Sequence, residues 1–118
     1  MNNLVHWELM VSEPERAQRF YGRVFGWTFE PMGPEYTMVK TGAVPFGGMM
    51  KKPPGAPGCV LNSYFAVDDV ERTLHDVVEA GGTVVVPKTE IPGIGWFAMF
   101  LDPDRIPLGV MQELRNAR

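Results

Sequence analysis

The strongest constraint on this chain is an internal repeat with an offset of 56 residues. Residues 9–16 align with residues 65–72, and residues 26–29 align with residues 82–85. A repeat of this length is one supersecondary unit that cannot bury its apolar face alone, so the two copies must pack on each other or on a second chain. Two copies within 118 residues therefore indicate a duplicated half-domain.

Composition and charge exclude several classes of protein. A chain that is 45% hydrophobic can form one globular domain with a core of ordinary size. Its net charge of −3 and scattered basic residues offer no surface for nucleic acid. Cys59 is the single cysteine, which excludes an internal disulfide and suits a reducing compartment. Without a membrane-length apolar run or a secretion signal, we expect a cytoplasmic protein that binds no membrane.

The first repeat predicts a strand, a helix and three further strands. Residues 4–11 alternate between apolar and polar side chains, as in a strand with one apolar face. Ser12 and Glu15 have the spacing of a capping box, and Gly26 is expected to end the helix that follows. Short strand-like runs are found at 27–30, 35–41 and 44–50.

The second repeat predicts the same order of elements. A proline- and glycine-rich loop, 51–59, joins repeat 1–50 to repeat 60–114 within a single domain. Asp68 and Glu71 repeat the capping pattern before a helix that ends near Gly81. Strands are expected at 61–67, 83–87, 95–101 and 106–112. The predicted fold class is therefore α+β, with two tandem βαβββ units whose curved mixed sheets form a cleft.

The alternation assigns each side chain of the first strands to a face. The strongly apolar faces should pack under the helices, and the opposite faces should line the cleft. We expect seven apolar residues in the core, Val5, Trp7, Leu9, Val11, Leu61, Phe65 and Val67. Four polar residues should surround one pocket, His6, Glu8, Asn62 and Tyr64.

Several short segments resemble a known superfamily. They are Arg-Ala-Gln-Arg-Phe-Tyr at 16–21, Val-Phe-Gly-Trp at 24–27, Ala-Val-Asp-Asp-Val at 66–70, Ala-Gly-Gly-Thr at 80–83 and Asp-Pro-Asp at 102–104. In this order and spacing, across essentially the whole chain, they resemble the vicinal oxygen chelate superfamily, which includes glyoxalase, bleomycin-resistance proteins and extradiol dioxygenases. Fold membership alone does not name a reaction.

The resemblance implies a position for a divalent metal. The superfamily's enzymes typically hold the ion with one side chain from the first and one from the last strand of each unit. Those positions fall on His6 and Asn62, on Gly48 or Met49, and on Gly109. Glycine supplies no side-chain ligand and an amide is a poor ligand for a transition metal, so we expect no metal cofactor. If a divalent metal does bind, its ligands should be His6 and Glu8.

The polar cleft residues each have a functional and a simpler interpretation. Glu8 lies two residues from His6 on the same side of a strand, where it can act as a general base or pair with the ring. His6 can instead be satisfied by Glu8 or by the backbone. Asn62 and Tyr64 offer an amide and a phenol that can orient a small ligand. In the simpler interpretation they form hydrogen bonds with other groups of the protein. Most strand methionines are expected to fill space, and Met111 is assigned to the pocket lining.

Two functions remain open at this stage. The first is a protein that binds a small organic ligand without the full metal site, in the manner of the resistance proteins. The second is a glyoxalase-like lyase or isomerase that uses a divalent metal or Glu8 as general base. The missing ligands favour the first. A half-barrel of this size leaves apolar edges, so a homodimer is expected as well.

Arg105 departs from the glycine that usually follows Asp-Pro-Asp in this superfamily. A residue with a side chain at this turn must either avoid a positive φ angle or bear some strain.

Overall fold

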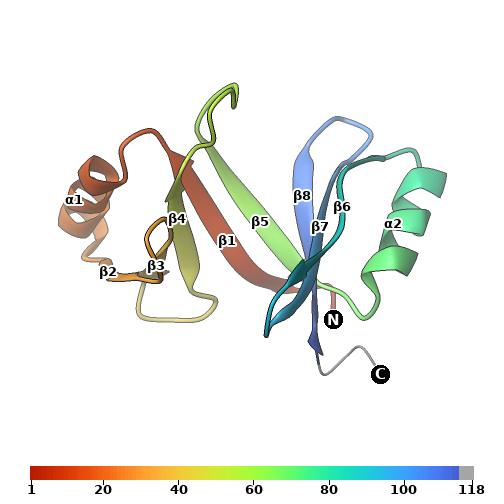
Figure 1. The fold of residues 1–118 in the computed structure, drawn as a ribbon, viewed down its shortest axis with the longest axis horizontal. Coiled ribbons are helices and arrows are strands. Elements are labelled where there is room, and N and C mark those ends of the chain that lie inside the picture. Colours follow the sequence, from red (N-terminus) through yellow and green to blue (C-terminus); the bar gives the residue numbers. More distant parts are fainter. Residues whose placement is uncertain (115–118) are drawn as a thin grey trace. The chain divides into compact units, whose positions relative to one another are not determined.

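The computed structural model describes residues 1–114, and their elements follow the predicted order twice. The first series is β1 (Leu4–Val11), α1 (Pro14–Phe25), β2 (Thr28–Pro31), β3 (Thr37–Lys40) and β4 (Gly47–Lys51) (Figure 1). The second is β5 (Val60–Ala66), α2 (Val70–Glu79), β6 (Thr83–Ile91), β7 (Gly95–Leu101) and β8 (Pro107–Glu113). The predicted α+β class with two βαβββ units is confirmed. No helix in the described part of the chain is long and apolar enough to cross a membrane.

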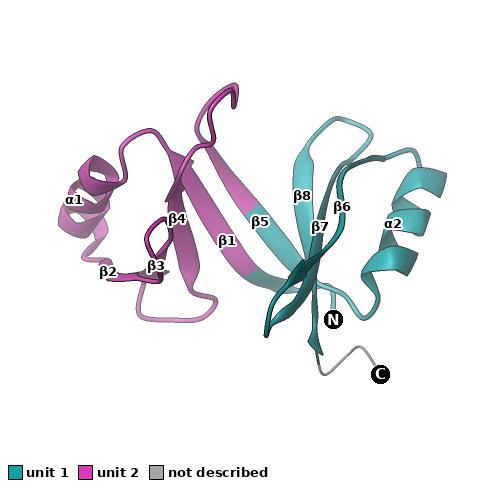
Figure 2. Cartoon of the chain, viewed as in Figure 1, with its two compact units in different colours: residues 1–5, 63–118 teal, residues 6–62 magenta. Residues whose placement is uncertain are grey.

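The chain divides into two compact units, which Figure 2 distinguishes by colour. The first-repeat unit comprises residues 6–62, and the second-repeat unit comprises residues 1–5 and 63–118. Pro14 and Val70, which begin the two helices, are separated by the offset of 56 residues found in the sequence. The sequence repeat is therefore a structural repeat.

Both units use the same pairing of strands. The strand order is β2-β3-β4-β1 in the first-repeat unit and β5-β8-β7-β6 in the second. The first and last strands of each repeat, β1 with β4 and β5 with β8, pair in parallel, whereas the other pairs within each unit are antiparallel. A parallel pair needs a long crossover connection, which the helix and two intervening strands supply. The last strand of each repeat therefore lies beside the first.

Trp7 packs on the helix side of the first-repeat sheet. Its indole ring lies 5.4 Å from that of Trp27, which also contacts Tyr21 and Phe25 of α1. The indole N–H donates to the carbonyl of Pro45 at 3.1 Å. A side chain on Gly47 would overlap the Trp7 ring, so glycine is required at this point of β4. The helix-facing side predicted for Trp7 is confirmed.

The second-repeat core is a cluster of small buried side chains with larger ones around it. Val67, Val70, Ala98 and Val110 form its buried cluster, against which Leu74, Trp96 and Phe100 pack. Gln112 is buried as well, and its side-chain oxygen accepts a hydrogen bond from the backbone N–H of Val70 at 2.8 Å. A buried polar group that satisfies an otherwise unpaired helix N–H stabilises both partners.

Of the seven predicted core residues only Val67 is buried, four are half-buried and two are exposed. Leu61 is 60% exposed and Val5 is 37% exposed. Both lie near the beginnings of their strands, and the alternation of a strand specifies a face but not how deeply each residue on it is buried. Helix α1 likewise contains no fully buried residue, and its Phe20 is 58% exposed.

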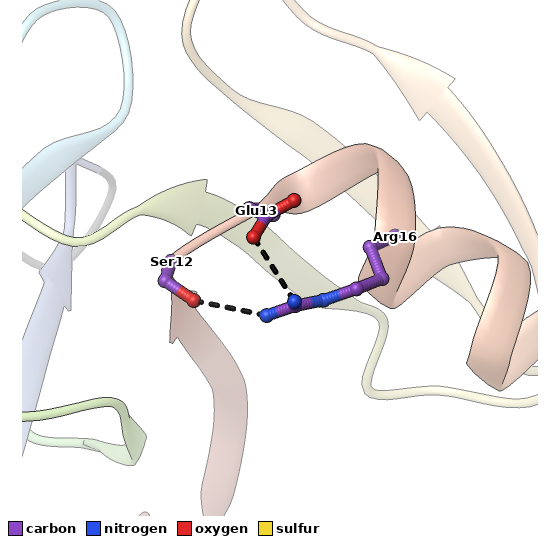
Figure 3. Close-up of polar contacts among 3 residues, drawn as sticks. All are labelled: Ser12, Glu13 and Arg16. Atoms are coloured by element: carbon purple, nitrogen blue, oxygen red, sulfur yellow. Dashed lines mark hydrogen bonds and ion pairs between the residues drawn. The ribbon is translucent and has the colours of Figure 1, made fainter.

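The predicted helix caps are each wrong by one residue. The residue that caps α1 is Glu13 rather than Ser12, and its side chain makes no cap hydrogen bond. Pro14 fixes the first helical position, so Ser12 lies outside the helix, and its hydroxyl accepts a hydrogen bond from Arg16 (Figure 3). In α2 the cap is Asp69, whose carboxylate accepts from the backbone N–H of Arg72 at 3.1 Å.

Arg105 adopts the positive φ angle that was expected to strain a residue with a side chain. Its φ angle is +67°, in the left-handed region that glycine accepts without a steric cost. The turn is held by Asp102, whose carboxylate accepts from the backbone N–H groups of Asp104 and Ile106, each at 2.8 Å. These bonds keep the arginine in an unfavourable backbone conformation.

Truncation of the Trp7 side chain should be strongly destabilising. We expect Trp7→Ala to lower the free energy of unfolding by about 3–5 kcal/mol, because it empties a packed site. Urea denaturation followed by circular dichroism measures the loss. Val44→Ala is the control, since Val44 is 81% exposed and its truncation should have little effect. A loss below about 1 kcal/mol for Trp7→Ala would show that the indole is not a core residue.

Replacement of Arg105 by glycine should stabilise the protein. A left-handed conformation costs a residue with a side chain about 1–2 kcal/mol, and the greater freedom of glycine in the unfolded chain offsets about 0.5–1 kcal/mol of this. Arg105→Gly should therefore raise the melting temperature, as calorimetry can measure. Arg105→Ala keeps the Cβ atom and should bring no such gain. Equal gains in both variants would assign the effect to the guanidinium group instead.

Candidate functional site

The candidate site is the side of the first-repeat sheet that faces away from α1. Trp7 points toward the helix, and since successive residues of a strand alternate, His6 and Glu8 point to the other side. Glu8 pairs with Gly48 of β4, and Gly48 pairs with Met38 of β3. We call this surface the His6 face.

Tyr36 lies on the His6 face beside the histidine. Its hydroxyl oxygen is 2.8 Å from Nε2 of His6, and the two rings are stacked with their centroids 6.4 Å apart. A Cβ atom built on Gly48 would overlap the Tyr36 hydroxyl, so the phenol occupies the space into which a side chain of Gly48 would project. The last-strand position left open as Gly48 or Met49 is therefore Gly48, because Met49 is buried on the opposite side.

The sequence reasoning above did not select Tyr36. Two signals could have found it. Tyr36 precedes β3 with the parity of Met38, which places it on the same side of that strand. The adjacent Gly47 and Gly48 within β4 indicate close approach of other groups on both sides of the sheet.

His6 is neutral at physiological pH. Burial lowers the pKa of His6 below its ordinary value of 6.5, and this effect outweighs the charge of Glu8 and a hydrogen bond with the backbone of Phe46, which both raise it. Nε2 of His6 and the Tyr36 hydroxyl share one hydrogen bond, and the tautomer of the ring decides which of the two donates.

Asn62 and Tyr64 each have a methionine sulfur as a partner. Asn62 is buried, and its amide donates to the sulfur of Met10 at 3.6 Å. Met10 follows Glu8 on the same side of β1. Tyr64 belongs to the second-repeat unit, where its hydroxyl donates to the sulfur of Met99 at 3.8 Å. The Tyr64 ring covers Gly109 much as Tyr36 covers Gly48. That these residues share one pocket with His6 and Glu8 stays a prediction.

Met111 lies on the same side of the second-repeat sheet as Tyr64. It pairs with Ala66 of β5 and with Phe97 of β7, and Phe97 contacts the Tyr64 ring edge-on at 6.5 Å. Thioether and aromatic groups of this kind adapt to apolar ligands. The assignment of Met111 to a ligand pocket remains a prediction.

The four positions implied for a divalent metal do not fit an ion. Gly48 and Gly109 contribute no donor atom, and aromatic rings fill the space beside both. Nε2 of His6 is hydrogen-bonded with the Tyr36 hydroxyl, and the amide of Asn62 donates to a sulfur atom. Among residues 1–114 there is no group of three or more His, Cys, Asp or Glu side chains arranged to hold a metal.

A separate hollow lies between the end of β1 and α1. Its volume is about 310 Å³, and its walls include Val11, Phe20, Tyr21 and Cys59. Arg16, at its rim, is held by Ser12 and by an ion pair with Glu13 at 3.0 Å, as Figure 3 shows. None of the predicted ligand-binding residues lines this hollow, and its one cation is already paired. The His6 face is therefore the better candidate site.

Comparison with known protein sequences finds one matching family model and several relatives. A family model described as "Bleomycin resistance protein-like N-terminal" matches residues 3–42. The chain is 36% identical over 110 residues to the putative glyoxylase CFP32 of Mycobacterium bovis and of Mycobacterium tuberculosis. The match covers 89% of this chain and 42% of each relative, so the chain spans about two fifths of the length of these curated proteins.

Solved structures show the same fold at low sequence identity. A glyoxalase/bleomycin resistance protein/dioxygenase superfamily member from Vibrio splendidus matches with a TM-score of 0.68 and 18% identity, over 94% of this chain and 100% of that one. The Mn(II)-bound glyoxalase of Novosphingobium aromaticivorans matches with a TM-score of 0.69 and 18% identity, over 94% of this chain and 38% of that one. With its repeated βαβββ units and its glyoxylase relatives, the chain belongs to the glyoxalase/bleomycin resistance protein/dioxygenase superfamily, the vicinal oxygen chelate superfamily.

Proposed function

We propose that this protein binds a small organic ligand on the His6 face without the superfamily's full metal site. The observation that carries the proposal is the position of Tyr36, whose hydroxyl fills the space beside Gly48 and binds Nε2 of His6. Nε2 of the imidazole is thus already hydrogen-bonded within the protein. The remaining groups, a carboxylate, a phenol and an imidazole, suit hydrogen bonding to a small molecule.

A catalytic alternative rests on the pairing of Glu8 with His6. The charge of Glu8 acts on the His6 ring, and both side chains lie on the same side of β1. In a glyoxalase-like lyase or isomerase, Glu8 would act as the general base that removes a proton from the substrate. The glyoxylase names of the relatives favour this alternative. Glycine at two of the four implied ligand positions disfavours the metal-dependent form of this enzyme.

The function is tested with protein purified without a histidine tag. We expect elemental analysis to find far less than one transition metal per chain, and ligands found by NMR screening of a fragment library to bind equally well after treatment with a chelator. Glu8→Gln should weaken their binding with little loss of stability, because it removes a charge from the surface of the sheet rather than a core group. About one bound metal per chain would instead support the metal-dependent enzyme.

The neutral state of His6 predicts a pH dependence of stability. Because burial lowers the pKa of His6 from 6.5, the unfolded chain takes up a proton at a higher pH than the folded protein. The contribution of His6 is therefore fully present above pH 6.5 and falls as the pH drops from there through the lowered folded pKa. Denaturation at pH 7.5 and 5.5 should show a larger loss for the wild type than for His6→Gln. Equal losses would contradict the shift.

A further inference from the structure

The two helices that the repeat relates carry opposite charges. Residues 12–23, which contain most of α1, have three arginines and two glutamates. The equivalent residues 68–79, which contain α2, have one arginine and five acidic residues. The charged residues of both segments are exposed, so the core does not require this difference. The solvent-facing surfaces of α1 and α2 are therefore electrostatically complementary to each other.

The outward side of α1 combines cations with an aromatic ring. Four exposed residues at positions i, i+3, i+4 and i+7 share one face of the helix and form what we call the basic strip, Arg16, Arg19, Phe20 and Arg23. Arg16 is paired with Glu13, whereas Arg19 and Arg23 form no ion pair within residues 1–114. Phe20 is 58% exposed. Arginine beside an exposed aromatic ring is typical of a surface that another protein covers.

The corresponding side of α2 is acidic. Asp76 and Glu79 stand at the positions of Phe20 and Arg23 in the repeat. We call the exposed carboxylates of this segment the acidic surface, Asp68, Asp69, Glu71, Asp76 and Glu79. An apolar side chain accompanies them, because Val78 is 57% exposed. The acidic surface thus offers both the charge and an apolar contact that the basic strip lacks partners for.

We propose that the basic strip of α1 in one copy of this chain binds the acidic surface of α2 in a second copy. Each copy carries one surface of each kind, so the contact needs no other protein. The net charge of −3 disfavours an anionic lipid surface or a nucleic acid in this place, because a polyanion repels the chain as a whole. The contact is independent of the ligand proposed for the His6 face.

This contact should be weak and sensitive to salt. Two short helices bury a small area, and ion pairs at their rims stay exposed to solvent. Sedimentation equilibrium of the full chain should show association that increases with protein concentration at low ionic strength. The dissociation constant should rise at least about tenfold in about 0.5 M NaCl, which screens charges over a few ångströms.

Charge reversal on each helix tests which surfaces meet. Arg19→Glu combined with Arg23→Glu gives α1 the charge of α2, and Asp76→Lys combined with Glu79→Lys gives α2 the charge of α1. Each double variant alone should associate at least about tenfold more weakly than the wild type, because its two helices repel those of other copies. An equimolar mixture of the two variants should restore the association, since opposite charges then face each other again.

The matched control changes the same amount of charge outside both helices. Lys51→Glu combined with Lys52→Glu alters the net charge as much as the α1 variant does, and its association should stay within about twofold of the wild type. Circular dichroism checks that every variant is folded. If a double variant does not fold, the single changes Arg23→Glu and Glu79→Lys are measured alone and mixed, with the same expected loss and recovery in a smaller amount.

Four results would overturn the proposal. One is a wild type that stays monomeric at low salt up to about 1 mM. Another is association that neither charge reversal weakens, which would place the contact on a different surface. A third is a mixture that associates no better than its components, since the two helices would then not meet. The last is sedimentation of the wild type, but not of the α1 variant, with phosphatidylserine-containing vesicles, which would assign the basic strip to a lipid surface.

Discussion

The packing of aromatic rings against glycines of the last strands is the constraint on which the rest of this structure depends. Trp7 covers Gly47 on the helix side of the first-repeat sheet, and Tyr36 covers Gly48 on the other side. In the second-repeat unit Tyr64 covers Gly109. Any side chain at these glycines would displace a ring, and with it either the core or the hydrogen bonds of the candidate site.

The two sides of the first-repeat sheet use this packing for different ends. On the helix side the large indole of Trp7 contacts Trp27, which in turn contacts Tyr21 and Phe25 of α1, a helix with no fully buried residue. On the other side the smaller phenol of Tyr36 reaches His6 instead of a hydrophobic partner. One side therefore contributes to stability, and the other carries a polar pair, His6 and Tyr36, that a hydrogen bond holds together.

Duplication does not make the two units chemically equivalent. The positions of His6 and Glu8 correspond to Asn62 and Tyr64 at the repeat offset, so an imidazole and a carboxylate in one copy become an amide and a phenol in the other. Each copy covers its glycine with a tyrosine, but Tyr64 comes from the first strand whereas Tyr36 precedes the third. The polar groups that could orient a ligand are thus distributed unevenly, with the only carboxylate of the four predicted positions in the first-repeat unit.

The sequence by itself determined the order of the elements, the duplication and the face assigned to Trp7. Strand alternation is a pattern of neighbouring residues, and the duplication is visible when the sequence is aligned with itself. Helix starts were misplaced by one residue, since the cap depends on Pro14 and on hydrogen bonds that spacing alone does not specify. Only the tertiary structure decided that Leu61 is exposed, that Gly48 rather than Met49 faces the site, and that Tyr36 fills the vacant position. These facts arise from the register between strands far apart in the sequence, which sets the neighbours that each side chain meets.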